Sequence, residues 1–452
     1  MNQTTFRSNW YLIMLGAVLA MRLGSTVTAN LSYFAIAAFA LLGRTQAIMA
    51  LVLTWLFGSL NPEMAAETTL GASGRFFVIG AAAISMLLRG AISLQALRGN
   101  RVAIATLLLG IFLICHSLLV SPFTDVSILK AISWTVVTIT LFAAWGGVNA
   151  DERAWAERQL LGVLVAVMLF SLPLLALPQF GRAVNDTGFQ GILNHPQVFG
   201  PCMALLGAWV GANMLGEAIP PVRTYLLVCS CLLLVVLSEA RTGGIAMVMG
   251  IGVSAFLVAW LNGQRLLHVL PGIASKRSYL VVVVALVAAV LSGAQLTDRI
   301  GEYFDKGNRA ESTGLLDAYG LSRGALIDLM VDNIEAHPLS GIGFGIASYS
   351  EGMIIDRDPL LGLPIGAAIE KGVFPIAVIE ELGIFGAIIV VAWLWIVMRR
   401  ASRAGVAELT VVLTTLMLNM GENTFFSPGG FGLLPLILVV WAATAQPVQS
   451  RT

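Results

Sequence analysis

Three arginines at the edges of apolar segments have the chemistry to hold a phosphate group. Arg182 lies in the polar stretch "QFGRAVNDTGFQGILNHPQ", Arg241 in the turn "LSEARTGG", and Arg323 near the start of "SRGALIDLMVDNIEAHPLSGIGFG". A guanidinium group is planar and can contact two phosphate oxygens at once. The three arginines are therefore candidates for binding a phosphate or diphosphate. For Arg241 the alternative is structural, an ion pair with Glu239 that closes the turn.

Four further residues could move a proton or stabilise a leaving group. Glu370 and Lys371 begin the stretch "EKGVFPIAVIEELGIFG", and burial can tune a carboxylate to act as a base near neutral pH. His195 precedes a proline at the start of an apolar segment, where Asn194 is the expected N-cap. His337 also precedes a proline and either caps a helix or belongs to the site. These two histidines, with the glutamate and the lysine, are the candidate catalytic residues.

Two more glutamates, Glu380 and Glu381, follow in the same apolar stretch. At roughly 1.5 Å per helical residue they are expected about 12–15 Å deeper along the helix than Lys371. A charged side chain costs about 2.5–3.5 kcal/mol at the centre of a membrane helix. We therefore expect these glutamates to position loops or to pair with a buried arginine, for which Arg89 is a candidate.

The composition is that of a membrane protein. Of the 452 residues, 58% are hydrophobic and 11% are charged, whereas a soluble chain has about 25% charged residues. The four cysteines lie in or beside apolar segments and are expected to be core residues. The sequence contains no HExxH motif, CxxC pair or Asp-rich metal loop. We predict an all-α polytopic membrane protein with no metal, no other cofactor and no nucleic-acid partner.

Hydrophobic runs long enough to cross a bilayer predict 12 to 14 helices. The expected segments are 8–24, 29–42, 45–60, 76–96, 103–121, 129–148, 159–178, 198–218, 223–239, 241–262, 278–295, 373–398, 405–420 and 431–446. The two short ones, 29–42 and 45–60, form either two thin spans or one interrupted hairpin. This pattern divides the chain into an amino-terminal helix bundle (1–295), a long loop (296–372) and carboxy-terminal helices (373–452).

Basic residues in short loops predict the orientation. With the amino terminus in the cytoplasm, "GNR", "SKR" and "MRRASR" all lie on the cytoplasmic side, and so does the carboxy terminus. The short outer loops then hold Arg22, Arg75, Lys130, Arg182 and Arg241. The loop 296–372 is outside the cell membrane in this orientation. Apolar residues recur at helical spacing over 322–335, which predicts an amphipathic helix packed on the spans.

The order of three motifs resembles that of the O-antigen ligase and O-antigen polymerase superfamily. The motifs are "LSEARTGG", then "SRG…AHPLSGIGFG" in a long outer loop, then "ELGIFG" in the next span, within roughly residues 179–400. The resemblance implies a fold of the glycosyltransferase C type in the bacterial inner membrane. It also implies a glycan on undecaprenyl pyrophosphate as donor, and a lipid-linked glycan or lipid A-core as acceptor, with polysaccharide-assembly proteins as possible partners. By motif position, Arg182, Arg241 and Arg323 match arginines of the family.

The sequence departs from the family at one position. Family ligases carry a His-Asn pair about nine residues before the Glu-Leu-Gly, and that histidine is taken as the base, but here the position is Gly372. Either Glu370, His195 or His337 takes this role, or the chain lacks ligase chemistry. The resemblance therefore slightly favours a polymerase over a ligase. The alternatives are a transporter or flippase of a lipid-linked sugar and a scaffold subunit of an export complex.

Overall fold

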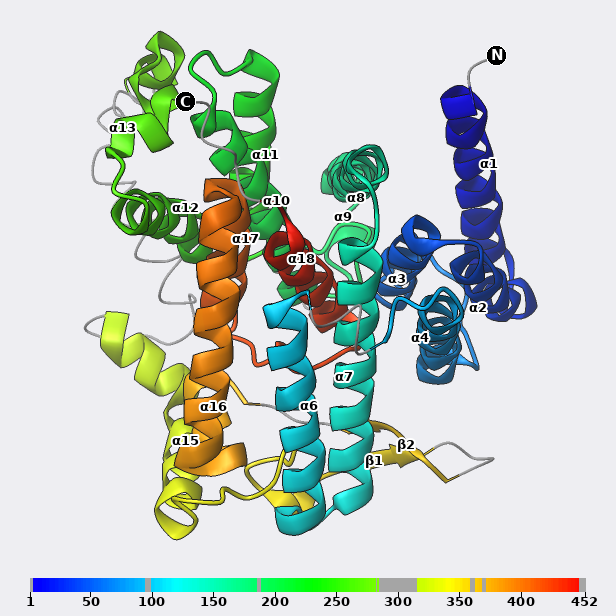
Figure 1. Ribbon diagram of the computed structural model, residues 1–452. Helices are drawn as coiled ribbons and strands as arrows, with labels where there is room; N and C mark the ends of the chain where they lie inside the picture. Colours follow the sequence, from blue (N-terminus) through cyan, green and yellow to red (C-terminus); the bar gives the residue numbers. More distant parts are fainter. Residues whose placement is uncertain are drawn as a thin grey trace.

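The computed structural model describes residues 3–93, 99–184, 188–281, 283, 315–357, 362–367 and 371–446. Within these ranges the chain is almost entirely helical, as predicted, and it has one short hairpin (Figure 1). The hairpin pairs β1 (Ile355–Arg357) with β2 (Pro364–Ala367) antiparallel. The main helices are α1 (Gln3–Gly24), α2 (Thr26–Leu41), α3 (Arg44–Gly58), α4 (Gly71–Leu88), α6 (Arg101–Val120), α7 (Thr124–Gly146), α8 (Ala150–Ser171), α9 (Pro178–Gly181), α10 (Pro196–Gly216), α11 (Val222–Leu237), α12 (Arg241–Leu261), α13 (Leu266–Val269), α15 (Leu315–Ala336), α16 (Phe374–Ala404), α17 (Val406–Leu418) and α18 (Leu433–Thr444).

Six of the described helices are long and apolar enough to cross a membrane. They are α6, α7, α8 with the 3-10 turn that follows it, α10, α12 and α16. Six further apolar helices have 10–17 residues. The protein is therefore a multi-pass helical membrane protein. The number of spans stays a prediction. A span needs roughly 17 residues or more, and the helices of the second group do not exceed that length.

The ambiguous segments 29–42 and 45–60 form two separate helices, α2 and α3, which pack on each other. Ser25 caps α2, since its hydroxyl accepts a hydrogen bond from the Thr28 backbone and the Thr28 hydroxyl reaches back to Ser25. The predicted segment 278–295 and the domain boundary near 295 lie almost wholly outside the described residues. The division into three regions is therefore still a prediction.

Three long helices, α6, α7 and α16, lie side by side and extend toward the lower end of the molecule in Figure 1. α15 packs along α16 there, and the hairpin lies against α7. The predicted amphipathic helix at 322–335 thus exists, but it begins earlier, at Leu315. Its inward face contains Met330, which is fully buried. This lower end holds the loops that the charge pattern places outside the cell membrane.

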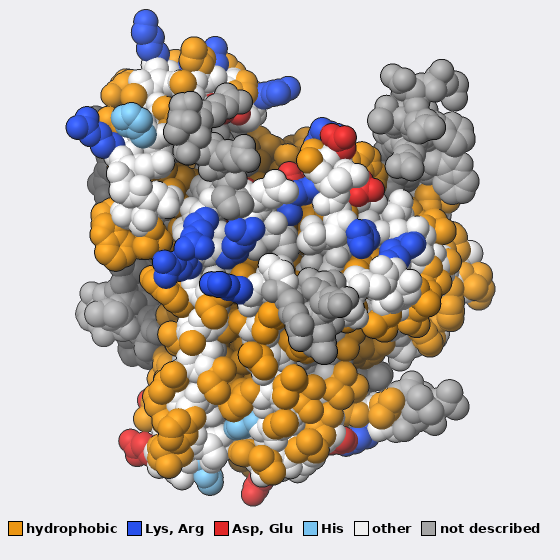
Figure 2. All heavy atoms as spheres, in the orientation of Figure 1, with side chains coloured by type: hydrophobic (Ala, Val, Ile, Leu, Met, Phe, Trp, Pro, Cys, Tyr) orange, Lys and Arg blue, Asp and Glu red, His pale blue; other side chains and the backbone are white. Residues whose placement is uncertain are grey.

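The surface has bands of different chemistry (Figure 2). Lys and Arg side chains gather across the middle of the face shown, and hydrophobic side chains cover most of the surface below them. α6 begins with Arg101 and α16 carries Arg399, Arg400 and Arg403 near its end. α6 has 20 residues, about 30 Å at 1.5 Å per residue, which matches the hydrocarbon core of a bilayer.

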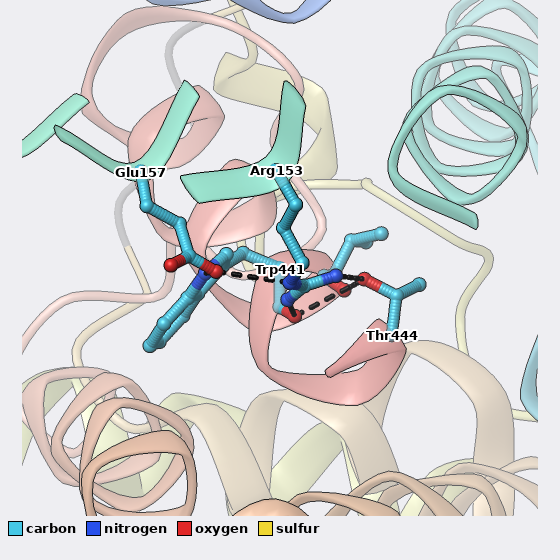
Figure 3. A network of polar contacts seen from close by, with 5 residues as sticks. Arg153, Glu157, Trp441 and Thr444 are labelled. Atoms are coloured by element: carbon cyan, nitrogen blue, oxygen red, sulfur yellow. Dashed lines mark hydrogen bonds and ion pairs between the residues drawn. The ribbon is translucent and has the colours of Figure 1, made fainter. Parts of the chain in front are cut away.

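A polar network fastens the start of α8 to the end of α18 (Figure 3). The Arg153 guanidinium donates to the Trp441 carbonyl (2.7 Å) and the Thr444 hydroxyl (3.2 Å), and it pairs with Glu157 (2.9 Å). Trp441 Nε1 donates to the same Glu157 carboxylate at 2.7 Å. An arginine at the carboxyl end of a helix satisfies carbonyls that have no partner within the helix.

Candidate functional site

α16 is interrupted at Gly383. This glycine has φ 66° and ψ −179°, so the helical backbone opens within an apolar segment. The Ile384 amide that follows donates to the Pro338 carbonyl at 3.0 Å instead of to a carbonyl of its own helix. A Cβ at Gly383 would collide with the Leu339 carbonyl oxygen. The position therefore requires glycine both for its left-handed φ and for the close approach of another backbone.

The stretch "HPLSGIGFG" fills the opening in α16. The Ile342 amide donates to the Glu380 carbonyl (2.8 Å), and the Gly343 amide donates to the Glu381 carbonyl (3.1 Å). Gly341 has φ 69°, and a Cβ there would lie 2.6 Å from the Glu381 carbonyl oxygen. The loop thus supplies the backbone donors that the opened helix lacks. Irregular backbone at membrane depth is tolerated where protein satisfies it in this way.

The side chains of Glu380 and Glu381 at this junction belong to a buried ionic cluster. Lys371 Nζ is 2.7 Å from Glu380 Oε2 and 3.3 Å from Glu381 Oε1, and the three side chains are at most 5% exposed. Asn333 Nδ2 donates to Glu380 Oε1 at 2.7 Å, and the Gly345 amide donates to Glu381 Oε2 at 2.6 Å. Each carboxylate therefore has a charged partner and a neutral donor. The cluster joins α15, the glycine-rich loop and α16.

Lys130 of α7 balances the cluster. Its ammonium lies 5.2 Å from the centroid of the Phe344 ring, and it interacts electrostatically with Glu381. Two lysines thus face two glutamates. The expected partner, Arg89, is exposed at the far end of α4, where it donates to the Leu41 carbonyl at 2.9 Å. That prediction was wrong about the partner, although pairing itself occurs.

Lys371 was also expected at the outer mouth, apart from the two glutamates, but its side chain is buried against both of them. α16 begins at Phe374, and the Lys371 side chain runs inward beside its first turns instead of staying at the mouth. The prediction measured distance along the helix axis only. It left out the length and flexibility of the lysine side chain, whose apolar stem can lie along a helix.

His116 of α6 holds the same loop from the opposite side. Its Nε2 donates to the Ser340 carbonyl at 2.7 Å, and only 8% of the residue is exposed. Nearby, a Cβ at Gly343 would lie 2.8 Å from Ser121 Cα at the end of α6. His116 was not predicted as a site residue from the sequence. The available signal was a single histidine inside the apolar run "GIFLICHSLLV".

The segment that carries Arg182 is fastened to the turn before α12. Arg182 directly follows α9 and is partly buried. The Gln190 amide donates to the Gly181 carbonyl, and the Phe189 amide donates to the Leu237 carbonyl, both at 2.8 Å. Two consecutive residues therefore bridge the Arg182 segment and the "LSEARTGG" turn. The structure brings together these two arginine-bearing segments from different loops.

Arg241 is the first residue of α12 and is partly buried. Glu239 and Arg241 form no ion pair with each other; instead the Arg241 amide donates to the Glu239 carbonyl at 3.0 Å. Glu239 has φ 56°, a conformation that non-glycine residues seldom adopt. On the other side, a Cβ at Gly421 would lie 2.6 Å from Thr242 Cγ2. The turn is thus packed tightly against the segment after α17.

That segment after α17 also reaches Lys371. Asn419 is fully buried, and its Oδ1 accepts from the amides of Thr424 (2.8 Å) and Phe425 (2.9 Å). The Asn423 amide donates to the Lys371 carbonyl at 3.2 Å. The segments that carry Arg182, Arg241 and Lys371 therefore form a continuous series of contacts. Asn419 was not recognised from sequence because its partners are backbone groups in an irregular turn.

The other predicted residues have different surroundings. His195, not Asn194, is the N-cap of α10, and its Nδ1 accepts from the Gln197 amide at 3.0 Å. His337 is exposed and directly follows α15, and its amide donates a hydrogen bond to the Asn333 carbonyl at the end of that helix. Arg323 lies on α15, but its side chain is outside what the structure describes, and Glu370 lies outside the described residues altogether.

Among the residues that the structure describes, no group of three His, Cys, Asp or Glu side chains could hold a metal ion. The described arrangement instead places two partly buried arginines on adjoining segments, next to a lysine–glutamate cluster whose charges balance. Such an arrangement suits an anionic ligand. No protein-family model matches this sequence, and no curated protein matches it.

Proposed function

We propose that the protein is a membrane glycosyltransferase. In this proposal it joins oligosaccharide units that are linked to undecaprenyl pyrophosphate, on the outer face of the bacterial inner membrane, as a fold of the glycosyltransferase C type with cytoplasmic termini. A polymerase is favoured over a ligase, because the ligase histidine position is Gly372. The motif order of the O-antigen ligase and polymerase superfamily is the first support.

The observation that carries the proposal is the contact series between arginine-bearing segments. The Arg182 segment and the Arg241 turn are separate in sequence, yet consecutive backbone bonds from Phe189 and Gln190 hold them together. Arginine is well suited to a diphosphate because its fork contacts phosphate oxygens bidentately. Two arginines on adjoining loops are an arrangement suited to a lipid-linked diphosphate that approaches along the membrane.

The proposed reaction requires charge stabilisation and one base. The acceptor hydroxyl attacks the anomeric carbon, the carbon–oxygen bond to the diphosphate breaks, and undecaprenyl pyrophosphate leaves with the electron pair. Arg182, Arg241 and Arg323 oppose the charge that develops on the leaving group. Glu370, His195 or His337 accepts the proton of the hydroxyl. Lys371, which two glutamates already neutralise, is assigned to positioning the loops instead of contacting the donor.

The test uses purified protein and a lipid-linked repeat unit, with products separated on a gel. Wild type is expected to give a ladder, whereas a single shift on lipid A-core would identify a ligase. Arg241→Ala is expected to lower the rate by roughly 10²-fold, the usual effect of losing one donor to a developing anion. Arg265→Ala, an exposed residue between α12 and α13, is the matched control. Full-length polymer from normally expressed Arg241→Ala would refute the assignment.

One observation favours the alternative, a transporter of a lipid-linked sugar. Transporters often place binding sites at interrupted membrane helices, and α16 is interrupted beside a buried ionic cluster. Reconstituted vesicles distinguish the two functions. A transporter moves the intact unit across the bilayer and leaves its length unchanged, whereas the enzyme lengthens it on one side.

A further inference from the structure

A second group of arginines lies apart from the site described above, where α1, α2 and α4 meet. Arg22 is near the end of α1, Arg75 is in the first turns of α4, and Tyr33 of α2 interacts electrostatically with both guanidiniums. A Cβ at Gly74 would lie 2.7 Å from Tyr33 Cγ, so the start of α4 is in direct contact with the tyrosine ring. We call these three residues the Arg22–Arg75–Tyr33 cluster.

The Arg22 side chain is fixed by two hydrogen bonds, but one of its donors lacks an acceptor among the described residues. It is 7% exposed, and its two terminal nitrogens donate to the carbonyls of Ala66 and of Phe57, the latter at 3.3 Å. Its Nε is buried and has no hydrogen-bond partner among the described residues. Both of its acceptors are neutral carbonyls, so the positive charge of this arginine is not neutralised by them.

The Arg75 guanidinium has fewer hydrogen-bond partners than that of Arg22. Its guanidinium lies 4.9 Å from the centroid of the Phe76 ring and against Gly429, where a Cβ would collide with it. Its Nε is buried without a partner, and no hydrogen bond from its side chain is formed with any residue that the structure describes. The guanidinium is thus held by packing and keeps its donors for another acceptor.

No carboxylate compensates these two cations within the described part of the chain. The acids of the adjoining loop, Glu63 and Glu67, are exposed and form no ion pair with described residues. The Tyr33 residue is 2% exposed, and its hydroxyl has no hydrogen-bond partner among described residues. Buried charges in proteins are normally paired, because an unpaired one is strongly unfavourable. Within the described residues the two guanidiniums therefore keep donors and positive charge that an anionic ligand could use.

We propose that the Arg22–Arg75–Tyr33 cluster binds the phosphoryl headgroup of a membrane lipid. Two guanidiniums provide the planar donor pairs that phosphate oxygens accept, and the tyrosine hydroxyl provides a further donor. A lipid is the fitting source, because Arg22 and Arg75 lie near the ends of the apolar helices α1 and α4, where a headgroup meets the protein. The charge pattern places both arginines on the outer face.

The position of the cluster relative to Arg241 indicates which lipid it binds, an inference that rests on the proposed function. The turn 419–432 touches Thr242, beside Arg241, through Gly421, and it touches Arg75 through Gly429. Two phosphoryl-binding sites would then flank one turn. If the glycosyl transfer proposed above is correct, the Arg22–Arg75–Tyr33 cluster holds the diphosphate of the second lipid-linked substrate.

Native mass spectrometry of the full-length protein in detergent tests the binding site without an activity assay. The probes are a short-chain isoprenyl diphosphate, phosphatidylglycerol and inorganic diphosphate, each titrated separately. Measurements are made in the Arg241→Ala background, so that binding at the first site is weakened. We expect Arg75→Gln to weaken binding of a lipid probe about tenfold or more, as for loss of a charged hydrogen bond. Tyr33→Phe is expected to weaken it less.

Arg89→Gln is the matched control, because Arg89 is at the opposite end of the same helix and is exposed. Tighter binding of the isoprenyl diphosphate identifies a carrier lipid, and equal binding of phosphatidylglycerol identifies a phospholipid headgroup; both support the site. Lipid affinity that is unchanged in both Arg75→Gln and Tyr33→Phe overturns it, as does binding of inorganic diphosphate alone.

The two proposals can fail separately. Loss of lipid binding in Arg75→Gln, with no product from wild type, would leave the lipid site standing and remove glycosyl transfer. A ladder from both wild type and Arg75→Gln, with unchanged lipid affinity, would leave the enzyme standing and remove the second site.

Discussion

The interpretation of Lys371 differs most between sequence and structure, because its side chain lies in surroundings that the sequence did not indicate. It was expected at the mouth of the site beside Glu370, but it lies inside the protein between two carboxylates. Both carboxylates have other donors as well, from Asn333 and Gly345. A buried ion pair of this kind contributes little net stability, but removing one partner leaves an uncompensated charge.

We therefore predict that Lys371→Met lowers the free energy of unfolding by about 3–5 kcal/mol. The double variant Lys371→Met with Glu380→Gln, which restores charge balance, should recover part of this loss. Thermal and denaturant unfolding in detergent measures both. Arg357→Gln is the control, because its 2.7 Å pair with Asp125 is 44% and 45% exposed and should be worth at most about 1 kcal/mol. An equal loss in Arg357→Gln and Lys371→Met would contradict the burial argument.

The unusual charges could be located from the sequence, but their partners could not. Glu380, Glu381 and Lys371 stand out in any apolar segment, because charge there is costly. Asn333 and His116 do not stand out, since polar residues of these types are common at helix ends and in cores. Their roles depend on contacts with residues 47 and 224 positions away, which no local spacing encodes.

At the scale of elements, the central feature is a membrane helix completed by a loop. At Gly383 the backbone of residues 338–343 replaces hydrogen bonds that α16 lacks: it donates to the Glu380 and Glu381 carbonyls and accepts from the Ile384 amide. "ELGIFG" was recognised as a motif, whereas the helix break was not predicted. A glycine inside an apolar run is common and tolerated, and the left-handed φ becomes necessary only when the loop approaches.

Gly383→Ala is predicted to detach the loop locally. The positive φ and the collision with the Leu339 carbonyl should cost about 1–3 kcal/mol, which raises amide exchange in residues 338–345 roughly tenfold or more. Hydrogen–deuterium exchange with mass spectrometry measures this. Gly252→Ala in α12 is the control, since a Cβ there meets nothing within 4 Å. Unchanged exchange in residues 338–345 of Gly383→Ala would show that the junction tolerates a side chain.

At the scale of the whole molecule, the composition of the sequence was enough to predict the fold class. It predicted less about where each helix ends and which side chains meet. Hydrophobicity and helical periodicity gave an all-helical membrane protein, and the structure has that architecture within the described residues. The predicted helix boundaries were less accurate than the predicted fold class. α4, for example, ends at Leu88 and not at 96, because apolar composition marks where a helix is favourable but not where tertiary contacts end it.

The orientation is open to a direct test by cysteine labelling. After replacement of the four native cysteines, Glu351→Cys, between α15 and the hairpin, should react with an impermeant maleimide in intact cells. Gln264→Cys, between α12 and α13, should react only after permeabilisation. Both residues are exposed, so accessibility within the protein does not limit either reaction. The reverse pattern would invert the topology and remove the proposed outer-face chemistry.

The junction between α16 and residues 337–345 also imposes an order on biogenesis. The loop leaves the ribosome first, and its acceptors on Glu380 and Glu381 are synthesised later. Until α16 has entered the bilayer, the loop has no partner on which to fold. The Asn423 contact with Lys371 adds a still later segment. Assembly of this end of the molecule is thus the last stage of maturation, and a chain truncated before α17 would be inserted in the membrane with this end unfinished.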